Sequence, residues 1–337
     1  MPSSNLPSVL SINDSRGSSA ALGPYSFRDK NYQRLFPPDL HFIQCLLAAT
    51  CHSQDRLRKE GYVLPDDLQS KSHGAKIHAR LRRQCLSTPI YNPFFPKRKA
   101  VALDCEMAGV KGGRSEVISI CVVDFFTGEL LIKSLVKQRE SIVDWRSDIH
   151  GILPSTMSVA VGRGQTLDGW ETTREELWKH VNENTVIVGQ SLQHDLKALR
   201  VVHANIVDTA IITADAVFGG HPDDRGGRRW GLQLLCQDLL HLQIRQGSGI
   251  HDDVEDTMAA REVALWYLCY PTELQKWANK ARKSFHSERE ENKRRTQQSK
   301  ARAPRRIHYY GTDYDEHLRW EDVMDWDLWP KSPPDSD

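Results

Sequence analysis

The sequence predicts an α/β protein with a mixed central sheet and helices on its faces. Short apolar runs rich in β-branched residues lie between residues 100 and 136, a pattern typical of consecutive strands. From residue 173 onward, helical periodicity alternates with short apolar runs, as in strand–helix units. Proline-rich residues 89–96 come just before the first strand and indicate where this domain begins.

Five strands are expected in the sheet, because five short apolar stretches end at a turn or at a charged residue. These stretches are 100–103, 117–126, 130–136, 186–188 and 206–207. Helices are expected where apolar residues recur at helical spacing. They cover 173–184, 192–201, 211–217, 232–240 and 254–268.

The domain organisation follows from changes in composition along the 337 residues. Residues 1–23 are rich in Ser, Pro, Asn and Gly, which predicts a disordered N-terminus. Residues 24–95 are expected to form a helical accessory region, and residues 96–272 the α/β domain. Residues 273–337 contain a basic helix or linker and then an acidic tail with tryptophans.

The accessory region contains one helix with a predicted apolar stripe and a second, basic helix at 78–85. The stripe is formed by Phe42, Cys45, Leu46 and Leu47. Cys45 and the pair Cys51-His52 suggest a metal site, but their spacing matches no known ligand pattern. We therefore assign these residues to packing or to the helix surface.

Composition excludes several classes of protein. Hydrophobic residues make up 39% of the chain and charged residues 26%, and the mean hydropathy is −0.54. No apolar stretch approaches the roughly 20 residues that cross a bilayer, and residues 1–14 show no secretory signal. The seven cysteines form no C-x-x-C pair, so a reducing intracellular compartment is expected.

The first candidate site residues are Asp104 and Glu106, at the end of the first strand. Side chains two apart on a strand share a face, so these carboxylates lie together while Cys105 points to the other side. Uncompensated carboxylates beside a core strand need cations or metal ions. An isolated D-x-E is more often a solvated strand end, so this pair alone carries little weight.

The second candidate is Asp195, near the start of a helix that follows an apolar strand. Strand-to-helix turns at a sheet edge are frequent ligand sites in α/β folds. An acid in this position also stabilises the helix N-terminus without any function, and the two interpretations are equally supported.

The third candidate is His251 with Asp256, five residues apart. This is not a helical neighbour spacing, so His251 is expected in a loop and Asp256 in the first turns of the next helix. Asp252 or Asp253 can cap that helix, with Glu255 or Asp256 completing a capping box. Capping accounts for the acids but not for the histidine.

Together these residues give the order D-x-E, D, H-x-x-x-x-D, and the chain resembles the DEDDh family of 3′→5′ exonucleases, in its branch of small eukaryotic RNA exonucleases. The resemblance covers about residues 99–270, half of the chain. It differs at one point: Asp252-Asp253 stand where relatives have small residues, and Ile250 replaces their usual glycine. The matching segments are 103–107 with Gly109, 142–146 with Gly151-Ile152, 188–189 with 194–199, Asp208-Thr209, and His251 with Glu255-Asp256.

The resemblance implies an RNase H-like fold and a metal-dependent 3′→5′ exoribonuclease that releases nucleoside 5′-monophosphates. His251 would be the general base, since an imidazole with an ordinary pKa near 6.5 can accept a proton at neutral pH. Two Mg²⁺ or Mn²⁺ ions would be held by hard oxygen ligands. These ligands are Asp104, Glu106, Asp195 and Asp256.

Single-stranded RNA is the expected partner, with single-stranded DNA as an alternative, and contacts to phosphates and stacked bases are expected to dominate. Met107 can pack against a terminal base, although an ordinary core methionine is an equal interpretation. The segment 219–230 carries glycines, Arg225, Arg228 and Arg229 and can steer the RNA backbone. A solvated loop is the alternative.

The C-terminal part suggests further contacts. Basic residues at 293–306 predict electrostatic RNA binding or nuclear import. A nuclear location is therefore expected, with the nucleolus and the cytoplasm as alternatives. A solvated helical extension is the simpler explanation. The acidic tail with Trp320, Trp326 and Trp329 is an expected protein-binding segment or a disordered end.

Two other functions remain open at this point. A DNA-directed 3′→5′ exonuclease would use the same residues, and only substrates with and without 2′-hydroxyls separate the two activities. A catalytically silent nucleic-acid-binding or scaffold protein would keep the fold. The presence of all five key residues argues against the silent protein.

Overall fold

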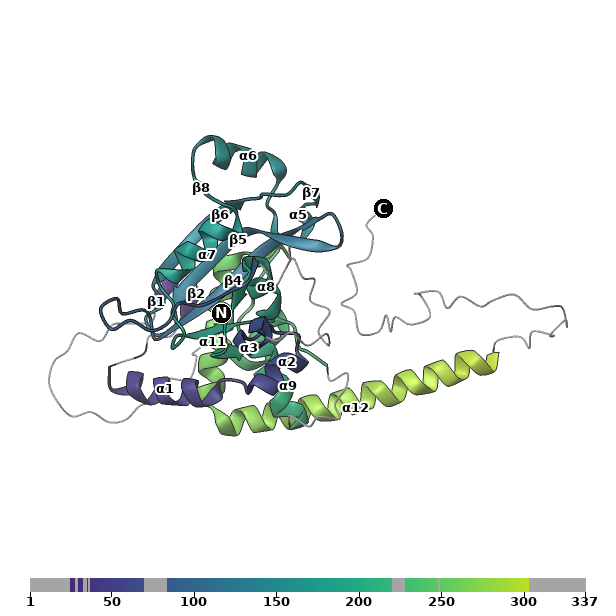
Figure 1. Cartoon of the computed structure of the whole chain (residues 1–337). Coiled ribbons are helices and arrows are strands. Elements are labelled where there is room, and N and C mark those ends of the chain that lie inside the picture. The colour runs from purple at the N-terminus through teal and green to yellow at the C-terminus, as the bar shows by residue number, and fades with distance from the viewer. Residues whose placement is uncertain are drawn as a thin grey trace, which may run out of the picture.

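The structure is a computed structural model in which the central sheet and its helices form one body (Figure 1). Some segments of the chain are not described. Those that are described are residues 25–27, 30–32, 35, 37–69, 84–219, 228–247 and 249–302.

The central sheet mixes antiparallel and parallel pairs. β4 (Ala100–Val110), β5 (Arg114–Asp124) and β6 (Leu130–Lys137) form an antiparallel meander. β9 (Val186–Gly189) pairs parallel with β4, and β11 (Ile206–Asp208) pairs parallel with β9. The predicted α/β class and mixed sheet are confirmed, and a strand is present at each of the five predicted stretches.

Two further strands complete the sheet, so the predicted number of five was wrong. β7 (Ile142–Asp144) pairs with β4, and β8 (Thr166–Asp168) pairs with β6. The sheet thus has seven strands in the order β11-β9-β4-β5-β6-β8, with β7 off this path. Both additional strands have three residues, and β7 has the same Ile-Val-Asp sequence as the predicted strand β11, so the local pattern alone does not decide which short stretch pairs with the sheet.

Helices cover both faces of the sheet (Figure 1). On one face lie α7 (Gly169–Trp178) and α8 (Gln193–Leu199), whose apolar side chains belong to one core cluster. On the other face lie α11 (Asp253–Cys269) and α1 (Pro37–Thr50), which contribute to a second cluster. The bounds predicted for the helix at 173–184 were wrong at both ends, since α7 runs from Gly169 to Trp178.

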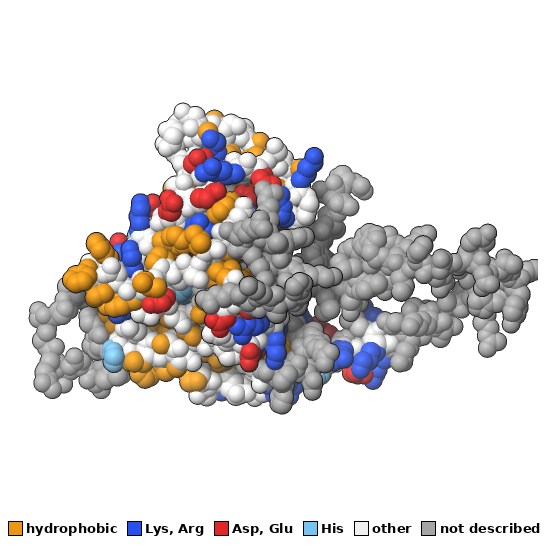
Figure 2. Space-filling view, in the orientation of Figure 1, with side chains coloured by type: hydrophobic (Ala, Val, Ile, Leu, Met, Phe, Trp, Pro, Cys, Tyr) orange, Lys and Arg blue, Asp and Glu red, His pale blue; other side chains and the backbone are white. Residues whose placement is uncertain are grey.

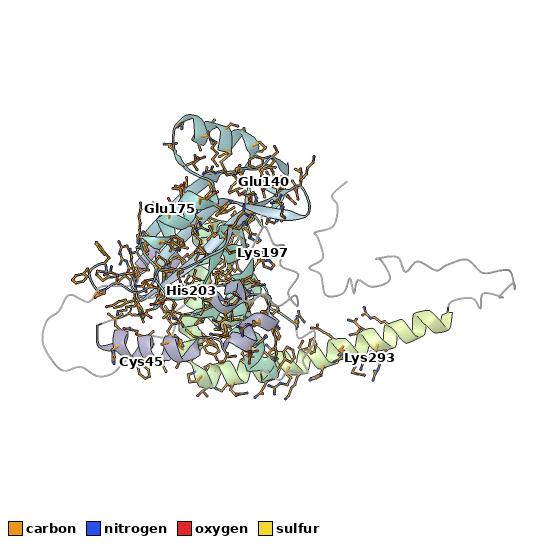
Figure 3. The ribbon with its side chains drawn as sticks, in the orientation of Figure 1. Cys45, Glu140, Glu175, Lys197, His203 and Lys293 are labelled. Atoms are coloured by element: carbon orange, nitrogen blue, oxygen red, sulfur yellow. The ribbon has the colours of Figure 1, made fainter. Side chains whose placement is uncertain are left out.

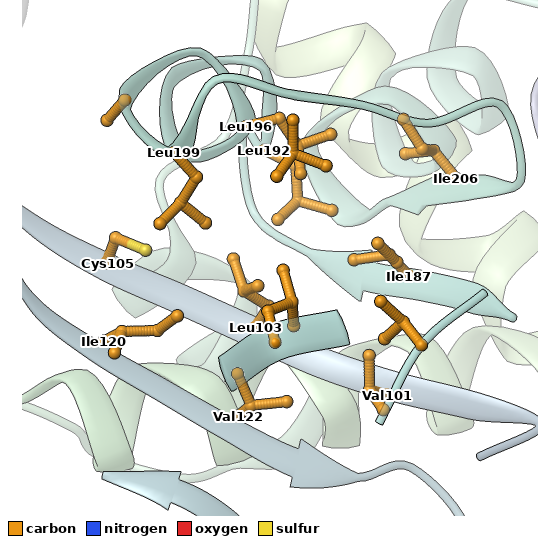
Figure 4. Close-up of a cluster of buried hydrophobic side chains, with 14 of the residues drawn as sticks. Val101, Leu103, Cys105, Ile120, Val122, Ile187, Leu192, Leu196, Leu199 and Ile206 are labelled. Carbon is orange, nitrogen blue, oxygen red and sulfur yellow. The ribbon is translucent and has the colours of Figure 1, made fainter. Parts of the chain in front are cut away.

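The first core cluster shows how the sequence of β4 divides between the two faces. Val101, Leu103 and Cys105 point into this cluster, whereas Ala100 and Ala102 belong to the cluster on the α11 side. Figure 4 shows the leucines of α8 and its preceding turn standing over β4 and β5. The period of two along β4 thus leaves Asp104 and Glu106 on the α11 side.

The C-terminal half adds a third cluster. It is built from α9 (Thr209–Phe218), α10 (Leu232–Leu235), the π-helical turn η1 (Cys236–Leu240) and part of α12 (Pro271–Arg302). α12 is 32 residues long and extends well past the body (Figure 1). Lys293 lies on the projecting part (Figure 3), so the predicted basic stretch begins on this helix, while residues after 302 lie outside the described residues.

The remaining elements are short. Among them, β3 pairs parallel with β10, and β1 pairs antiparallel with β2. Their bounds are β1 (Tyr25–Phe27), β2 (Lys30–Tyr32), α2 (Gln54–Lys59), α3 (Pro65–Gln69), β3 (Leu86–Ser87), α5 (Ser147–His150), α6 (Pro154–Gly162) and β10 (Val201–Val202).

The stripe predicted for the first helix was wrong in part. On α1, Ile43 and Leu47 are each only 1% exposed, whereas Phe42 is 61% exposed and Cys45 is also exposed. Spacing alone does not say which side of a helix the sheet will cover, and here the sheet covers the pair four residues apart. The N-terminus 1–23, most of the predicted basic helix at 78–85 and the acidic tail lie outside the described residues.

The surface is varied in character. Charged side chains of both signs intermix over the upper part of the face seen in Figure 2, and hydrophobic ones gather toward its left. In the part of the chain that the structure describes, no helix combines the length and apolarity needed to cross a membrane.

Gly189, the last residue of β9, is expected not to tolerate a side chain. A Cβ built there would lie 2.6 Å from Leu192 Cδ2 and 2.7 Å from the Leu103 carbonyl oxygen. The second atom belongs to the backbone of β4, which cannot move away without disturbing the strand. Gly189→Ala is expected to lower the free energy of unfolding by about 3 kcal/mol, as overpacking does, measured by urea titration.

Gly162 on α6 provides the matched control, because a Cβ there meets nothing within 4 Å. Gly162→Ala is expected to change stability by less than about 1 kcal/mol, in the stabilising direction. Equal effects of the two substitutions would contradict the close approach at Gly189.

Candidate active site

The candidate site begins on β4. Glu106 is buried, while Asp104 is partly exposed, and both lie on the face covered by α11. The register of β4 against β5 shifts between Glu106 and Met107, an irregularity that re-aims the side chains beyond it. The two carboxylates therefore occupy the last regular positions of the strand before this bulge.

Asp195 reaches the same strand from α8. Its side chain is 4% exposed, and its Oδ1 accepts a hydrogen bond of 2.9 Å from the backbone N–H of Cys105. Cys105 stands between Asp104 and Glu106, so this bond anchors Asp195 beside both. The chain reverses sharply to bring α8 there, with Ser191 in the left-handed conformation at φ 57°.

Asp256 and His251 come from the start of α11. Asp256 lies buried in the first turn, and His251 lies in the preceding loop, held by its N–H donating to the Ile149 carbonyl at 2.7 Å. His251 Nδ1 is 3.4 Å from Asp256 Oδ2. One ligand atom from each of Glu106, His251 and Asp256 lies within 4.8 Å of the others.

The sequence-predicted residues thus come together from three separate parts of the chain. Glu106, His251 and Asp256 form the tight group. Asp195 is tied to the backbone between the two acids of β4, and Asp104 is close enough to be repelled by Asp195, Asp256 and Glu106.

Burial and mutual repulsion dominate the electrostatics of these groups. Loss of solvent raises the pKa of Asp104 and Asp195, and neighbouring carboxylates raise both further. Burial, with repulsion from Asp256 and Asp253, raises the pKa of Glu106 to about 8. Negative charge at the site therefore outweighs the positive charge of the described residues around it.

His251 departs from the sequence expectation in its pKa. Burial, followed by the nearby charges of Arg245 and His150, lowers the pKa of His251 to about 4 rather than the ordinary 6.5. The imidazole is neutral throughout the physiological range, and its protonation begins at more acidic pH than the sequence predicts.

Two cations that the sequence did not indicate partly compensate the carboxylates. Arg245 forms a bidentate pair with Asp256, with Nε 3.2 Å from Oδ1 and Nη2 2.7 Å from Oδ2. Lys133 on β6 forms a salt bridge with Asp253, which also accepts a 2.6 Å hydrogen bond from Ser119 Oγ. No motif marked either cation, since each meets its partner only through the fold.

The same contacts explain the unusual pair Asp252-Asp253. Asp252 caps α11, since its Oδ1 accepts from the N–H groups of Val254 and Glu255, each at 3.1 Å. Asp253 is buried and paired with Lys133. Neither extra acid therefore points uncompensated into the site, and the predicted capping role of this pair is confirmed for Asp252.

A second buried network supports the turn that carries Asp195. Asp208 accepts hydrogen bonds from the N–H groups of Ser191 (2.9 Å) and Leu192 (3.1 Å). Tyr62 from the accessory region donates its hydroxyl to Asp208 Oδ2 at 2.5 Å, and the Asp208 N–H donates to His52 Nε2 at 3.0 Å. His52 thus has a structural role.

The predicted substrate contacts are partly occupied within the protein. Met107 packs against the first core cluster while remaining partly exposed. Arg228 pairs with Glu288 at 2.6 Å, and Arg229 pairs with Glu60. Both arginines are partly exposed, and Arg225 lies outside the described residues.

The carboxylates fit the binding of divalent cations. Glu106 Oε1 is buried and has no hydrogen-bond partner among the described residues, an arrangement that is costly unless a ligand completes it. Carboxylate oxygens are the donors preferred by Mg²⁺ and Mn²⁺. The oxygen-rich donor set, with one imidazole, suits such ions better than zinc.

Comparison with known proteins agrees with this geometry. Residues 101–264 match the RNase T family, described as exonuclease. These residues, just under half of the chain, are similar to that family and are named here the exonuclease domain. The match spans β4 through most of α11, so the exonuclease domain includes every residue of the candidate site, together with Lys133, Asp208 and Arg245.

Curated relatives of the exonuclease domain include three that illustrate its range. RNA exonuclease 3 of Candida albicans is 28% identical over 51% of this chain and 39% of its own length. Small RNA degrading nuclease 2 of Arabidopsis thaliana is 30% identical, over 50% and 34%. RNA exonuclease 4 of Candida glabrata is 30% identical, over 56% and 65%. The chain thus aligns with only part of each relative.

Among solved structures, this chain is similar to the Pan2 pseudoubiquitin hydrolase–RNA exonuclease module of Saccharomyces cerevisiae. The sequence identity is 19% and the TM-score 0.47, over 60% of this chain and 34% of that one.

Without divalent ions, the free energy of unfolding is expected to fall as the pH rises from about 6.5 to about 8. The folded exonuclease domain keeps a proton on Glu106 up to a pKa of about 8, whereas the unfolded chain releases it near 4.5. The folded state therefore binds more protons than the unfolded state in this range. For each such proton, the free energy of unfolding falls by up to about 1.4 kcal/mol per pH unit. His251 has a pKa of about 4 in the folded state and near 6.5 in the unfolded chain, so its opposing contribution is confined to the acidic end of this window.

Urea titrations in EDTA at several pH values measure this slope. Glu106→Gln removes the titrating group while keeping its shape, so its stability should depend less on pH. A variant slope equal to that of the unmodified protein would show that the pKa of Glu106 is not raised.

Proposed function

We propose that this chain is a metal-dependent 3′→5′ exoribonuclease that hydrolyses the last phosphodiester of single-stranded RNA and releases nucleoside 5′-monophosphates. The observation that carries the proposal is the grouping of Glu106, His251 and Asp256 beside Asp104 and Asp195. The names of the relatives, RNA exonucleases and a small RNA degrading nuclease, support RNA as the substrate.

Four carboxylates would hold two Mg²⁺ or Mn²⁺ ions. The buried, unpartnered Glu106 Oε1 and the raised pKa values of Asp104 and Asp195 support this role, because bound cations would relieve both costs. When bound, such ions supply the positive charge that promotes water ionisation and stabilises a departing oxygen. The proposed ligands are Asp104, Glu106, Asp195 and Asp256.

His251 would act as the general base. Its lowered pKa keeps the imidazole unprotonated at neutral pH, and a neutral ring nitrogen can accept a proton from the attacking water. The bond from its backbone N–H to Ile149 fixes the loop that presents the ring. Asp256 beside Nδ1 would stabilise the imidazolium that forms.

The location of the protein is proposed from charge. The basic residues that begin on α12 support nuclear import or electrostatic attachment to RNA. A nuclear location is therefore the proposal, and fluorescence microscopy of the tagged full chain distinguishes it from the cytoplasm.

Asp195→Asn tests the catalytic role directly. The amide keeps the shape of the carboxylate but loses its charge, so release of mononucleotides from a 3′-labelled single-stranded RNA with Mn²⁺ is expected to drop by at least about a thousandfold. Asp66→Asn is the matched control, because Asp66 is an exposed acid on α3, and it should retain full activity. Comparable activity of the two variants would exclude the proposed role of Asp195.

Arg245→Met tests whether this arginine stands in for the cations. The variant should lose about 1–3 kcal/mol of stability in EDTA, since Asp256 loses a bidentate charged partner, and should gain more than the unmodified protein when Mn²⁺ is added. Differential scanning calorimetry with and without Mn²⁺ measures both effects. The control is Arg295→Met, which removes an exposed pair with Glu291 on α12 and should shift neither value.

The comparison of Arg245→Met with the unmodified protein also shows whether Arg245 and the ion share Asp256. A Mn²⁺ stabilisation that is the same for Arg245→Met and the unmodified protein would mean that Arg245 and the ion do not share Asp256.

A further inference from the structure

A cleft of about 390 Å³ opens beside the candidate site. One wall is formed by α10 and η1, which present Gln233 and Gln237 on successive turns. The other wall is the loop that leads toward α11 and carries Gln243, Arg245 and Gln246. This volume lies in the range of small-ligand pockets.

The loop wall is anchored to both neighbouring elements. The N–H of Leu242 donates to the Cys236 carbonyl at 3.0 Å, which ties the loop to η1. The N–H of Arg245 donates to Glu255 Oε2 at 2.7 Å, which ties it to α11. Arg245 itself has a left-handed backbone at φ 57°. These bonds indicate that the cleft is formed before any ligand arrives.

The chemistry of the lining is unusual for this region of the molecule. Among the described residues, four glutamines and one arginine line the cleft and no carboxylate does, although the neighbouring site is strongly acidic. Primary amides both donate and accept hydrogen bonds, and they match the edges of nucleobases. Within the described part of the chain, the side chains of Gln237 and Gln243 have no hydrogen-bond partner.

The position of the cleft relates it to the proposed chemistry. Arg245 lines the cleft and also bonds Asp256 through its guanidinium. The Arg245 side chain therefore separates the cleft from the Asp256 carboxylate. A strand whose last phosphodiester lies at Glu106, His251 and Asp256 would bring a neighbouring nucleotide, rather than the terminal one, to the cleft.

We propose that the cleft is a subsite for a nucleotide upstream of the one released, with the glutamine amides bonding its base and Arg245 attracting its phosphate. The inference rests on the proposed exoribonuclease function and extends it. Guanidinium groups recognise phosphate well, and the described lining residues, which include no carboxylate, do not repel a polyanion as the neighbouring carboxylates do.

Two substrates of different length test this subsite. The p-nitrophenyl ester of a nucleoside 5′-monophosphate contains only the terminal nucleotide, whereas a single-stranded RNA hexamer also provides upstream ones. The variant Gln237→Glu/Gln243→Glu keeps side-chain shape but replaces amide donors with negative charge. Gln237→Ala/Gln243→Ala removes the amides without adding charge, and Gln275→Glu on α12 is the control outside the cleft.

The expected result is a difference between the substrates. For the hexamer, KM should rise by at least about tenfold in the double Glu variant and about threefold to tenfold in the double Ala variant, as expected for lost hydrogen bonds, with kcat changing less than about twofold. The ester should be hydrolysed by all variants as by the unmodified protein. Fluorescence anisotropy of the labelled hexamer in EDTA should show a parallel rise in Kd.

Other outcomes overturn the inference in distinguishable ways. Hexamer KM and Kd within about twofold of the control would show that the cleft does not contact RNA. Ester hydrolysis that falls together with hexamer hydrolysis would assign the cleft to the terminal nucleotide. If the unmodified protein with Mn²⁺ cleaves neither substrate, the exoribonuclease function itself is wrong, and the subsite with it.

Discussion

The repulsion between carboxylates gathered on the α11 face of β4 is the constraint on which the site depends. Asp104 and Glu106 share that face because a strand alternates, and the domain then adds Asp195 and Asp256 from two helices. Each added acid makes every other one harder to ionise, as the pKa of about 8 for Glu106 illustrates. The folded state tolerates this repulsion because hydrophobic clusters lie on both faces of the sheet. The free energy that their burial contributes offsets the local destabilisation by the carboxylates.

The internal cations show how the rest of the domain adapts to that constraint. Lys133 reaches Asp253 from β6, and Arg245 reaches Asp256 from a loop. Each pair involves a buried carboxylate, and a buried charge with no partner would cost far more than the pair contributes. The compensation remains incomplete, since Glu106 Oε1 still lacks a partner, and this remaining deficit is where an external ligand has the most to contribute.

The outline of the fold and the members of the site were readable from the sequence, for a physical reason. Strands such as β4 and β9 are short apolar runs, and the acids stand at element ends, so local pattern and spacing report them. β7 and β8 were missed because a stretch of three residues does not show by itself whether it pairs with the sheet: β7 has the same sequence as β11, which was predicted. Lys133, Arg245 and Tyr62 escaped because their partners lie elsewhere in the chain and only the tertiary structure joins them. The same holds for α1, whose buried side depended on where the sheet lay.

The contacts of Tyr62 and Arg56 also bear on which part of the chain forms the minimal folding unit. The family match begins at residue 101. Two residues before it nevertheless bind the domain: Tyr62 donates its hydroxyl to Asp208, and Arg56 forms a salt bridge with Asp215 on α9, with Nη2 2.8 Å from Oδ1. A chain that began at residue 101 would lack the Tyr62 hydroxyl, which donates to the buried Asp208 carboxylate. That carboxylate holds the turn before Asp195 through its bonds to Ser191 and Leu192. Evolutionary and physical borders of the domain therefore do not coincide, and the accessory helices are better regarded as its outer shell than as a separate module.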